Sequence, residues 1–434
     1  MKSGSIKIEK LKANKKRIYF LCGFGCIVIL LIVLIINNSL AKYRTTQSIP
    51  LVNGTINYEL SDLNLIGVYI EEGNDYIKVD QIPDTGYTLN SEKSYCKIGE
   101  EKQNMMITYD MNTKNLTIAP MITKGTKCYL YFDEEPTLKD TILTNSKVNS
   151  GTPDFSRVAK TDEGLYKAQD DWGESYYFRG AVTNNWVKFA GYYWRIIRIN
   201  GDGSIRMIYN GTSTKATGTS TMINSSQAFN SSYNRSEYVG YMYTTGEQYG
   251  NTTNSPIKTV IDNWYSSNLA SYADKISKEA GFCGDREMAS GYLWSSEPSS
   301  TIYHKAYERL ITNKSPDLKC SNSDDLYTTS SSSKGNKALS NPVGLITADE
   351  MSIAGGVYTT NNTSYYLYNG EYYWTMSPYR AVSDGYALVF LVNSSGGLSN
   401  YGVNSPWGVR PVINLTHDVT IKSGNGTSST PYKI

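Results

Sequence analysis

The feature that most constrains this chain is an uncharged apolar run, IYFLCGFGCIVILLIVLII, at residues 18–36. As a helix, these 19 residues would rise roughly 28 Å, which is close to the thickness of a bilayer's hydrocarbon core. Residues 1–17 carry seven Lys or Arg and one acidic residue, and the positive-inside rule retains such a leader in the cytoplasm. The sequence therefore predicts a basic cytoplasmic leader (1–17) and a single-pass transmembrane signal anchor (18–36), with the lipid bilayer as a partner. The C-terminal domains are then extracellular.

A cleaved signal peptide is the alternative for the same segment. Ser39 and Ala41 form a small-x-small pattern just after the apolar run, as cleavage sites do. The apolar run is longer than the usual h-region of about 7–15 residues. We therefore favour the anchor and keep processing after Ala41 as the alternative.

The remainder of the chain is slightly acidic. The protein has 434 residues, and without residues 1–17 it keeps 35 basic and 39 acidic residues, a net charge of −4. A nucleic-acid-binding protein needs a basic face for its phosphate contacts, and the sequence shows no Lys/Arg stripe. Nucleic acid is therefore not an expected partner. The length predicts about two to four domains.

Four cysteines follow the apolar run, an even number that is typical of disulfide-bonded proteins in oxidising compartments. Three pairings of Cys96, Cys128, Cys283 and Cys320 are possible. The pairs Cys96–Cys128 and Cys283–Cys320 are favoured, because each closes a loop within one predicted domain and would contribute roughly 3–4 kcal/mol. Four buried, reduced thiols are the alternative.

Residues 45–135 are predicted to form a small all-β, sandwich-like domain. The runs VYIEEGNDYIKV, MMITYDMNTKNLTIAP and KCYLYFDEE alternate in polarity and are separated by turn residues. Residues 110–114 are expected to be a tight turn within a hairpin. Residues 136–153 show little periodicity and are predicted to be a linker.

Residues 154–420 are predicted to form a larger α+β domain with long loops, followed by a flexible tail (421–434). Residues 191–211, GYYWRIIRINGDGSIRMIYNG, predict a hairpin with its turn at NGDG. Residues 212–254, rich in Ser, Thr, Asn, Gly and Tyr, are expected to be a surface insertion.

Two helices are expected in this domain. One begins after Ser255, with Pro256 at its first position and an apolar face formed by Ile257, Val260, Ile261 and Trp264. The other begins after Thr347, which forms a capping box with Glu350, and it ends at Gly355. Strands and loops are expected after residue 356.

Several motifs carry a resemblance: GYYWRIIRINGDGSIRMIY, FCGDREMASGYLWSSEPSSTIYHKAYERL, NPVGLITADEMSIAGG, YYWTMSP and WGVRPVINL. Over residues 55–415 the chain resembles a group of uncharacterised, membrane-anchored surface proteins of gut Firmicutes and Mollicutes. The C-terminal region of that group is similar to the C-type-lectin-like fold of formylglycine-generating enzymes. The resemblance thus implies a C-type-lectin-like α+β domain.

The resemblance does not extend to the chemistry of that fold. Nothing here matches the copper-binding cysteine pair of formylglycine-generating enzymes. Calcium-dependent lectins carry a Glu-Pro-Asn type loop followed by Trp-Asn-Asp, whereas this chain has Glu297-Pro298-Ser299 without it. Architecture alone is therefore implied.

No catalytic constellation is evident. GxSxG, HExxH, P-loop and dinucleotide motifs are missing, as is any CxxC pair, and the two histidines, His304 and His417, are far apart. We therefore expect no cofactor, no metal and no catalytic residues. Adjacent acids such as Asp170-Asp171 and Asp324-Asp325 are expected to be solvated. Cys283 as a nucleophile with His304 as base is the weaker alternative.

The late loops are rich in Tyr, Trp, Asn, Ser and Gly. Tyrosine gives a rigid amphipathic surface at low entropic cost, so such loops suit ligand binding, although aromatic residues are also common in strands. Arg410 is expected to be a buried structural residue. The candidate ligand-binding residues are Trp374, Tyr379, Arg380, Asp384, Tyr386, Asn400, Tyr401, Asn404 and Trp407.

These observations favour a bacterial cell-surface adhesion or ligand-binding protein that recognises an extracellular glycan or protein without turnover. One alternative is an enzyme, either a divergent formylglycine-generating-like enzyme or a cell-wall hydrolase. The other is a structural, pilus-like surface-assembly component.

Overall fold

The computed structural model describes residues 64–83, 86–110, 113–119, 125–383 and 385–434. The chain divides into two compact units, Met1–Glu135 and Pro136–Ile434, each with its own core. The predicted linker is not a linker, because residues 136–153 form α2 and β9 of the second unit. The predicted tail is also ordered, since its strand β26 pairs with β12 and Tyr432 is fully buried.

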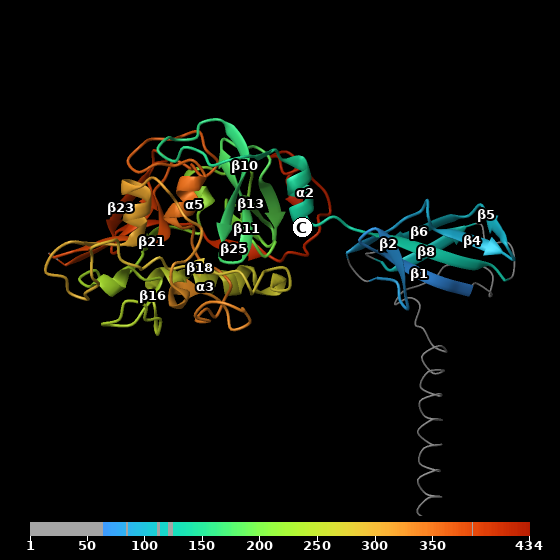
Figure 1. The fold of residues 1–434 in the computed structure, drawn as a ribbon, viewed down its shortest axis with the longest axis horizontal. Helices are drawn as coiled ribbons and strands as arrows, with labels where there is room; N and C mark the ends of the chain where they lie inside the picture. Colours follow the sequence, from blue (N-terminus) through green and yellow to red (C-terminus); the bar gives the residue numbers. More distant parts are fainter. Residues whose placement is uncertain (1–63, 84–85, 111–112, 120–124, 384) are drawn as a thin grey trace, which may run out of the picture. The chain divides into compact units, whose positions relative to one another are not determined.

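Unit 1 contains a mixed β-sheet with the strand order β2-β1-β8-β4-β5, in which β3 also pairs with β8 (Figure 1). The central pair β1–β8 is parallel, and the other pairs of this sheet are antiparallel. Its strands are β1 (Asn64–Glu72), β2 (Asp75–Val79), β3 (Tyr87–Leu89), β4 (Tyr95–Ile98), β5 (Glu101–Gln103) and β8 (Lys127–Glu134).

A separate hairpin, β6 (Met106–Asp110) and β7 (Asn115–Ala119), supplies the other part of the unit 1 core. The alternation of strand residues directs Val68, Leu130 and Phe132 inward, where they pack with Ile107 and Leu116 of the hairpin. The hairpin expected around residues 110–114, β6–β7, is confirmed, and β1 and β2 form a second antiparallel pair.

Unit 2 is built on two larger sheets. The eight-stranded sheet comprises β9 (Val148–Asn149), β10 (Asp162–Asp170), β11 (Gly173–Gly180), β12 (Trp186–Phe189), β13 (Tyr192–Ile199), β14 (Ile205–Tyr209), β25 (Val412–Leu415) and β26 (Tyr432–Lys433). The six-stranded sheet comprises β15 (Asn224–Ala228), β19 (Ile302–Tyr303), β21 (Tyr373–Val382), β22 (Tyr386–Val392), β23 (Leu398–Gly402) and β24 (Pro406–Val409).

Two short strand pairs and several short helices complete unit 2. The strand pairs are β16 (Met242–Tyr243) with β17 (Thr253–Asn254) and β18 (Phe282–Cys283) with β20 (Leu326–Tyr327). The α-helices are α2 (Leu138–Asn145), α3 (Pro256–Asn268), α4 (Lys305–Tyr307) and α5 (Ala348–Ile353). The remaining turns are the 3-10 helices η1 (Gly218–Thr221), η2 (Ser236–Val239), η3 (Ala270–Tyr272) and η5 (Ser323–Asp325) and the π-helical η4 (Glu308–Thr312).

The local signals for hairpin and helices are confirmed. β13 and β14 form the expected hairpin. Ser255 caps α3, whose first residue is Pro256, and Thr347 forms its capping box with Glu350 at α5. The 212–254 stretch is not a plain surface insertion, because its Phe229 and Tyr241 are fully buried in the core.

The predicted α+β class, with a transmembrane helix and a C-type-lectin-like α+β domain, is wrong. The protein is mostly β, with 38% strand and 14% helix. The central strands β13, β14 and β21 of unit 2 are buried at nearly every residue, so both faces of these strands are covered. The short helix α5 packs against strands of both large sheets (Figure 1).

The predicted membrane anchor at 18–36 lies outside the described residues. Among those that are described, no helix combines the length and apolarity that a bilayer crossing demands. The expected single-pass membrane topology, with a cytoplasmic N-terminus, is therefore not supported.

Both favoured disulfide bonds are confirmed. Cys96 and Cys128 are paired residues of β4 and β8, with Cα atoms 4.0 Å apart, and they lie in the core of unit 1. Cys283 of β18 bonds to Cys320, with Cα atoms 5.4 Å apart, in unit 2. Each bond thus lies within one unit, and the alternative of four free thiols is wrong.

Candidate ligand-binding surface

Two of the nine candidate ligand-binding residues are core residues. Trp374 of β21 is fully buried, and its Nε1 donates to the carbonyl oxygen of Gln227 at 2.8 Å. Tyr379, also on β21, is buried and packs edge-on against Phe390 with ring centroids 4.9 Å apart. Both rings are buried in the core of unit 2, so they are not available to a ligand.

The polar groups of two more candidates are hydrogen-bonded to neighbouring tyrosines. Arg380 is half-buried, and its Nη1 donates to Tyr303 Oη at 3.3 Å. Asn400 is half-buried, and its amide donates to Tyr358 Oη at 2.8 Å. Their polar groups therefore hold aromatic side chains in place. Asp384 lies outside the described residues.

Tyr401 and Trp407 form a cluster at the surface with Tyr372. Trp407 is half-buried and stacks on Tyr372 with centroids 4.5 Å apart, while Tyr401 packs edge-on against it. Tyr401 keeps 41% of its surface exposed. This cluster presents edges more than open ring faces, because its rings cover one another.

The remaining candidates, Tyr386 and Asn404, lie together at the surface. Tyr386, the first residue of β22, is 44% exposed and stacks on Tyr233, which is 38% exposed. The two ring centroids are 5.1 Å apart with an interplanar angle of 21°. Each ring therefore covers one face of the other and leaves surface open to solvent.

Two asparagines lie near this stack. A Cβ placed on Gly402 would lie 3.1 Å from Asn404 Oδ1 and 3.7 Å from Tyr386 Cδ1, so both side chains border the same unoccupied position of β23. Asn234, which is exposed, follows Tyr233. We call Tyr233, Asn234, Tyr386 and Asn404 the Tyr233–Tyr386 surface.

Backbone hydrogen bonds fix this surface. The N–H of Ala387 donates to the carbonyl oxygen of Tyr233 at 2.8 Å, and the N–H of Val403 donates to that of Ala387 at 3.0 Å. The loop bearing Tyr233 is thereby tied to β22 and to the end of β23. A surface that is ordered before binding loses little entropy when a ligand arrives.

Tyr233 and Asn234 are absent from the sequence-based candidates. They belong to the 212–254 stretch, whose Asn, Ser and Tyr content is the same as that of the late loops. Composition was therefore the available signal, but nothing in the sequence shows that this stretch meets β22.

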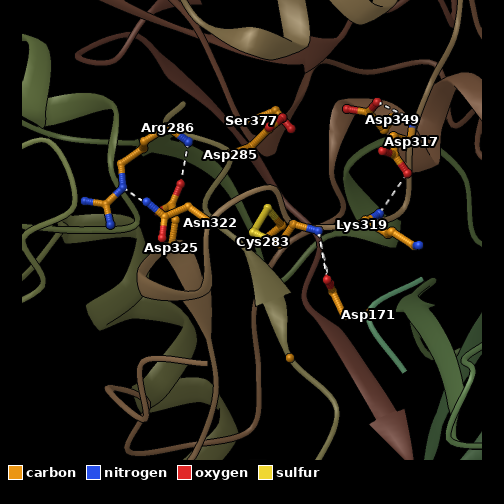
Figure 2. Close-up of a disulfide and its surroundings, with 12 residues drawn as sticks. Asp171, Cys283, Asp285, Arg286, Asp317, Lys319, Asn322, Asp325, Asp349 and Ser377 are labelled. Carbon is orange, nitrogen blue, oxygen red and sulfur yellow. Dashed lines mark hydrogen bonds and ion pairs between the residues drawn. A yellow bond between two sulfur atoms is a disulfide. The ribbon is translucent and has the colours of Figure 1, made fainter. Parts of the chain in front are cut away.

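A second candidate region is a polar cavity beside the Cys283–Cys320 bond. It holds about 20 Å³, room for about one water molecule. Figure 2 shows Asp171 on one side of the disulfide bond and Arg286 with Asp325 on the other. Asp171 accepts the backbone N–H of Cys320 at 3.1 Å, and burial raises the pKa of this carboxyl.

Arg309 joins two carboxylates at this cavity. Its Nη2 donates at 2.7 Å to Asp285 Oδ2 and to Asp349 Oδ2. Burial raises the pKa of Asp285 to about 6, although Arg309 acts to lower it. Asp285 also has a left-handed backbone with φ +57°, an unusual conformation for a non-glycine residue.

The deeper charges are paired in the same way. Arg198 binds both Asp170 and Glu350, and Arg206 also forms an ion pair with Glu350. Asp170 and Asp325 are buried, so the expectation that the adjacent acids are solvated is wrong for these two residues. Buried charges need such partners because desolvation is costly, and the network accordingly fastens the core.

The groups of the alternative Cys–His mechanism are not available to each other. Cys283 is oxidised to a disulfide, and His304 is fully buried with Nδ1 3.1 Å from the carbonyl oxygen of Arg286. Burial lowers the pKa of His304 to about 4. Among the residues that the structure describes, no three His, Cys, Asp or Glu side chains are grouped to hold a metal ion.

Arg410, expected to be structural, is buried and donates to the carbonyl oxygens of Tyr209 and Leu367 and to Asn210 Oδ1. It joins the two large sheets, because Tyr209 belongs to β14 and Arg410 follows β24.

No protein family model, curated protein or solved structure matched this chain.

Proposed function

We propose that this protein is a non-catalytic ligand-binding protein that recognises a neutral glycan through the Tyr233–Tyr386 surface. The observation that carries the proposal is the exposed stack of two tyrosines with the exposed side chains of Asn234 and Asn404 near it. Sugar rings have apolar C–H faces and a rim of hydroxyl groups. Tyrosine rings can pack against the apolar C–H faces. Asn side chains, which both donate and accept hydrogen bonds, can bind the hydroxyl groups.

The two disulfide bonds support a role in an oxidising compartment, where such bonds persist. The paired state of the buried acids and arginines supports binding without turnover, because these groups already neutralise one another.

A glycan array with the purified protein tests the proposal. We expect binding to neutral oligosaccharides that Tyr386→Ala and Tyr233→Ala each weaken. One aromatic contact is worth about 0.5–1.5 kcal/mol, or about 2- to 12-fold in affinity. Asn404→Ala should also weaken binding by removing a hydrogen bond.

Tyr272→Ala is the matched control. Tyr272 is 40% exposed, close to the exposure of Tyr386, but it packs on Phe189 of the other sheet. Its replacement should leave glycan binding unchanged. Absence of any neutral glycan binding, or an equal loss with Tyr272→Ala, would refute the proposal.

A further inference from the structure

The unit 1 sheet has one face turned away from its core, and this face is lined with tyrosines. Tyr69 of β1 is the register partner of Tyr131 of β8, and Tyr95 of β4 is the register partner of Tyr129 of β8. Tyr76 of β2 packs edge-on against Tyr131. All five side chains are half-buried, because the opposite face of the same strands carries the core residues.

The tyrosine rings cover each other's faces. Tyr69 and Tyr131 stack with centroids 4.7 Å apart at 10°, and Tyr95 and Tyr129 stack with centroids 5.0 Å apart at 20°. Such stacks leave ring edges and phenol hydroxyl groups at the surface. The face therefore offers hydrogen bonds more than open ring faces.

Lysines surround the tyrosines. Lys93 Nζ lies 4.2 Å from the centroid of Tyr76, and Lys102 Nζ lies 4.1 Å from that of Tyr95. Lys78 is the register partner of Tyr69 and therefore projects from the same face. We call this set the Tyr–Lys face; its members are Tyr69, Tyr76, Lys78, Lys93, Tyr95, Lys97, Lys102, Lys127, Tyr129 and Tyr131.

Three lysines of this face form a row across neighbouring strands. Lys97 of β4 is directly opposite Lys127 of β8 and directly opposite Lys102 of β5. Like charges in opposed positions destabilise a sheet. Glu100, which is itself highly exposed, pairs with Lys97 at 3.0 Å and offsets only one of the three charges.

The charges of unit 1 are segregated. Residues 64–135 contain seven lysines and twelve acidic residues, yet five of the lysines belong to the Tyr–Lys face. The acids on this face, Asp133 and Glu71, lie toward the other end of the strands, where Asp133 binds Tyr76 and Asn90. A positive face on this otherwise acidic segment is complementary to an anionic partner.

We propose that the Tyr–Lys face binds an anionic polysaccharide, with its carboxylates on the lysine row and its hydroxyl groups on the tyrosine edges. The five strands of this face, at a spacing of about 4.8 Å, give a contact length of roughly 19 Å. Single-stranded nucleic acid fits less well, since its binding depends on open aromatic faces on which bases stack. Here the aromatic faces are covered by neighbouring tyrosine rings and by Lys93 or Lys102.

The test uses the full-length protein and two probes that share a backbone, polygalacturonate and its fully methyl-esterified, neutral form. We expect polygalacturonate to bind, with an affinity that falls as salt rises, and the ester not to bind. The triple variant Lys97→Gln/Lys102→Gln/Lys127→Gln should lose at least about tenfold in affinity. Its thermal stability should equal or exceed that of the wild type, because the repulsion is removed.

The control variant Lys160→Gln/Lys188→Gln/Lys422→Gln changes the net charge equally, at exposed positions of unit 2. It should retain polygalacturonate binding, as should Tyr386→Ala, which separates this site from the Tyr233–Tyr386 surface. The proposal is overturned if polygalacturonate does not bind, if the ester binds equally, or if both triple variants lose affinity alike. Tighter binding of single-stranded DNA than of polygalacturonate also overturns it.

Discussion

Arg286 and Asp325 form a buried ion pair, with Nε 2.6 Å from Oδ1 and both side chains almost fully shielded from solvent. The Asp325 carboxylate also accepts the backbone N–H of Arg286. Arg286 Nη1 donates to the carbonyl oxygens of Met242 and Gly250. One guanidinium thus connects η5, which precedes β20, to β16 and to the loop between β16 and β17.

Replacing Arg286 with Met should therefore strongly destabilise unit 2. The change removes the cation and leaves the Asp325 charge buried without its partner, for which the expected cost is about 3–5 kcal/mol in the free energy of unfolding. Urea unfolding followed by tryptophan fluorescence measures it. Arg157→Met is the control, since the Arg157 side chain is 84% exposed and its pair with Asp154 is at the surface; a similar loss in both variants would contradict the account.

His304 should make stability depend on pH. Its pKa is lowered to about 4 by burial, from an ordinary value of 6.5, so the folded protein favours the neutral ring. The contribution of the neutral His304 ring to the free energy of unfolding is complete above pH 6.5. It is lost as the pH falls toward 4, by about 3 kcal/mol in all. Asp285, with its raised pKa, acts in the opposite direction as the pH rises through about 6.

The comparison that isolates His304 is wild type against His304→Gln, which cannot be protonated. As the pH falls from 6.5 to 4, the unfolding free energy of the wild type should decrease relative to that of His304→Gln. His417→Gln, at an exposed position, is the matched control and should show a constant difference. A constant difference for His304→Gln as well would contradict the account, because it would show that the ring binds protons equally in the folded and unfolded states.

The two disulfide bonds should differ in their rates of reduction. Cys96 and Cys128 are fully buried, whereas Cys283 and Cys320 are half-buried. Because exchange requires access of a thiolate to a sulfur atom, a dilute thiol should reduce Cys283–Cys320 first. Alkylation at time points, followed by peptide mapping, gives the order; earlier labelling of Cys96 and Cys128 would contradict it.

Local features of this fold were predictable because they depend on neighbouring residues. The β13–β14 hairpin follows from β-rich runs around Asn200–Gly203, and α3 and α5 begin at capping residues. The disulfide pairing was favoured because each bond closes a loop within one predicted domain. The contacts that join segments far apart in the sequence were not predictable in this way.

The candidate site shows the same division. Aromatic composition indicated Tyr386, Tyr401 and Trp407, which reach the surface, together with Trp374 and Tyr379, which are buried, since aromatic residues serve strand packing equally well. The partner of Tyr386 is Tyr233, more than 150 positions earlier, and only the fold brings them together. The buried Asp170 was missed because its partner Arg198 lies on another strand.

The most direct test of the proposed function is an NMR titration that follows the ring signals of individually assigned tyrosines while a neutral oligosaccharide is added. We expect the signals of Tyr233 and Tyr386 to shift in a saturable manner, and those of Tyr272 to stay unchanged. If a glycan binds while the Tyr233 and Tyr386 signals do not move, the Tyr233–Tyr386 surface is not the binding site.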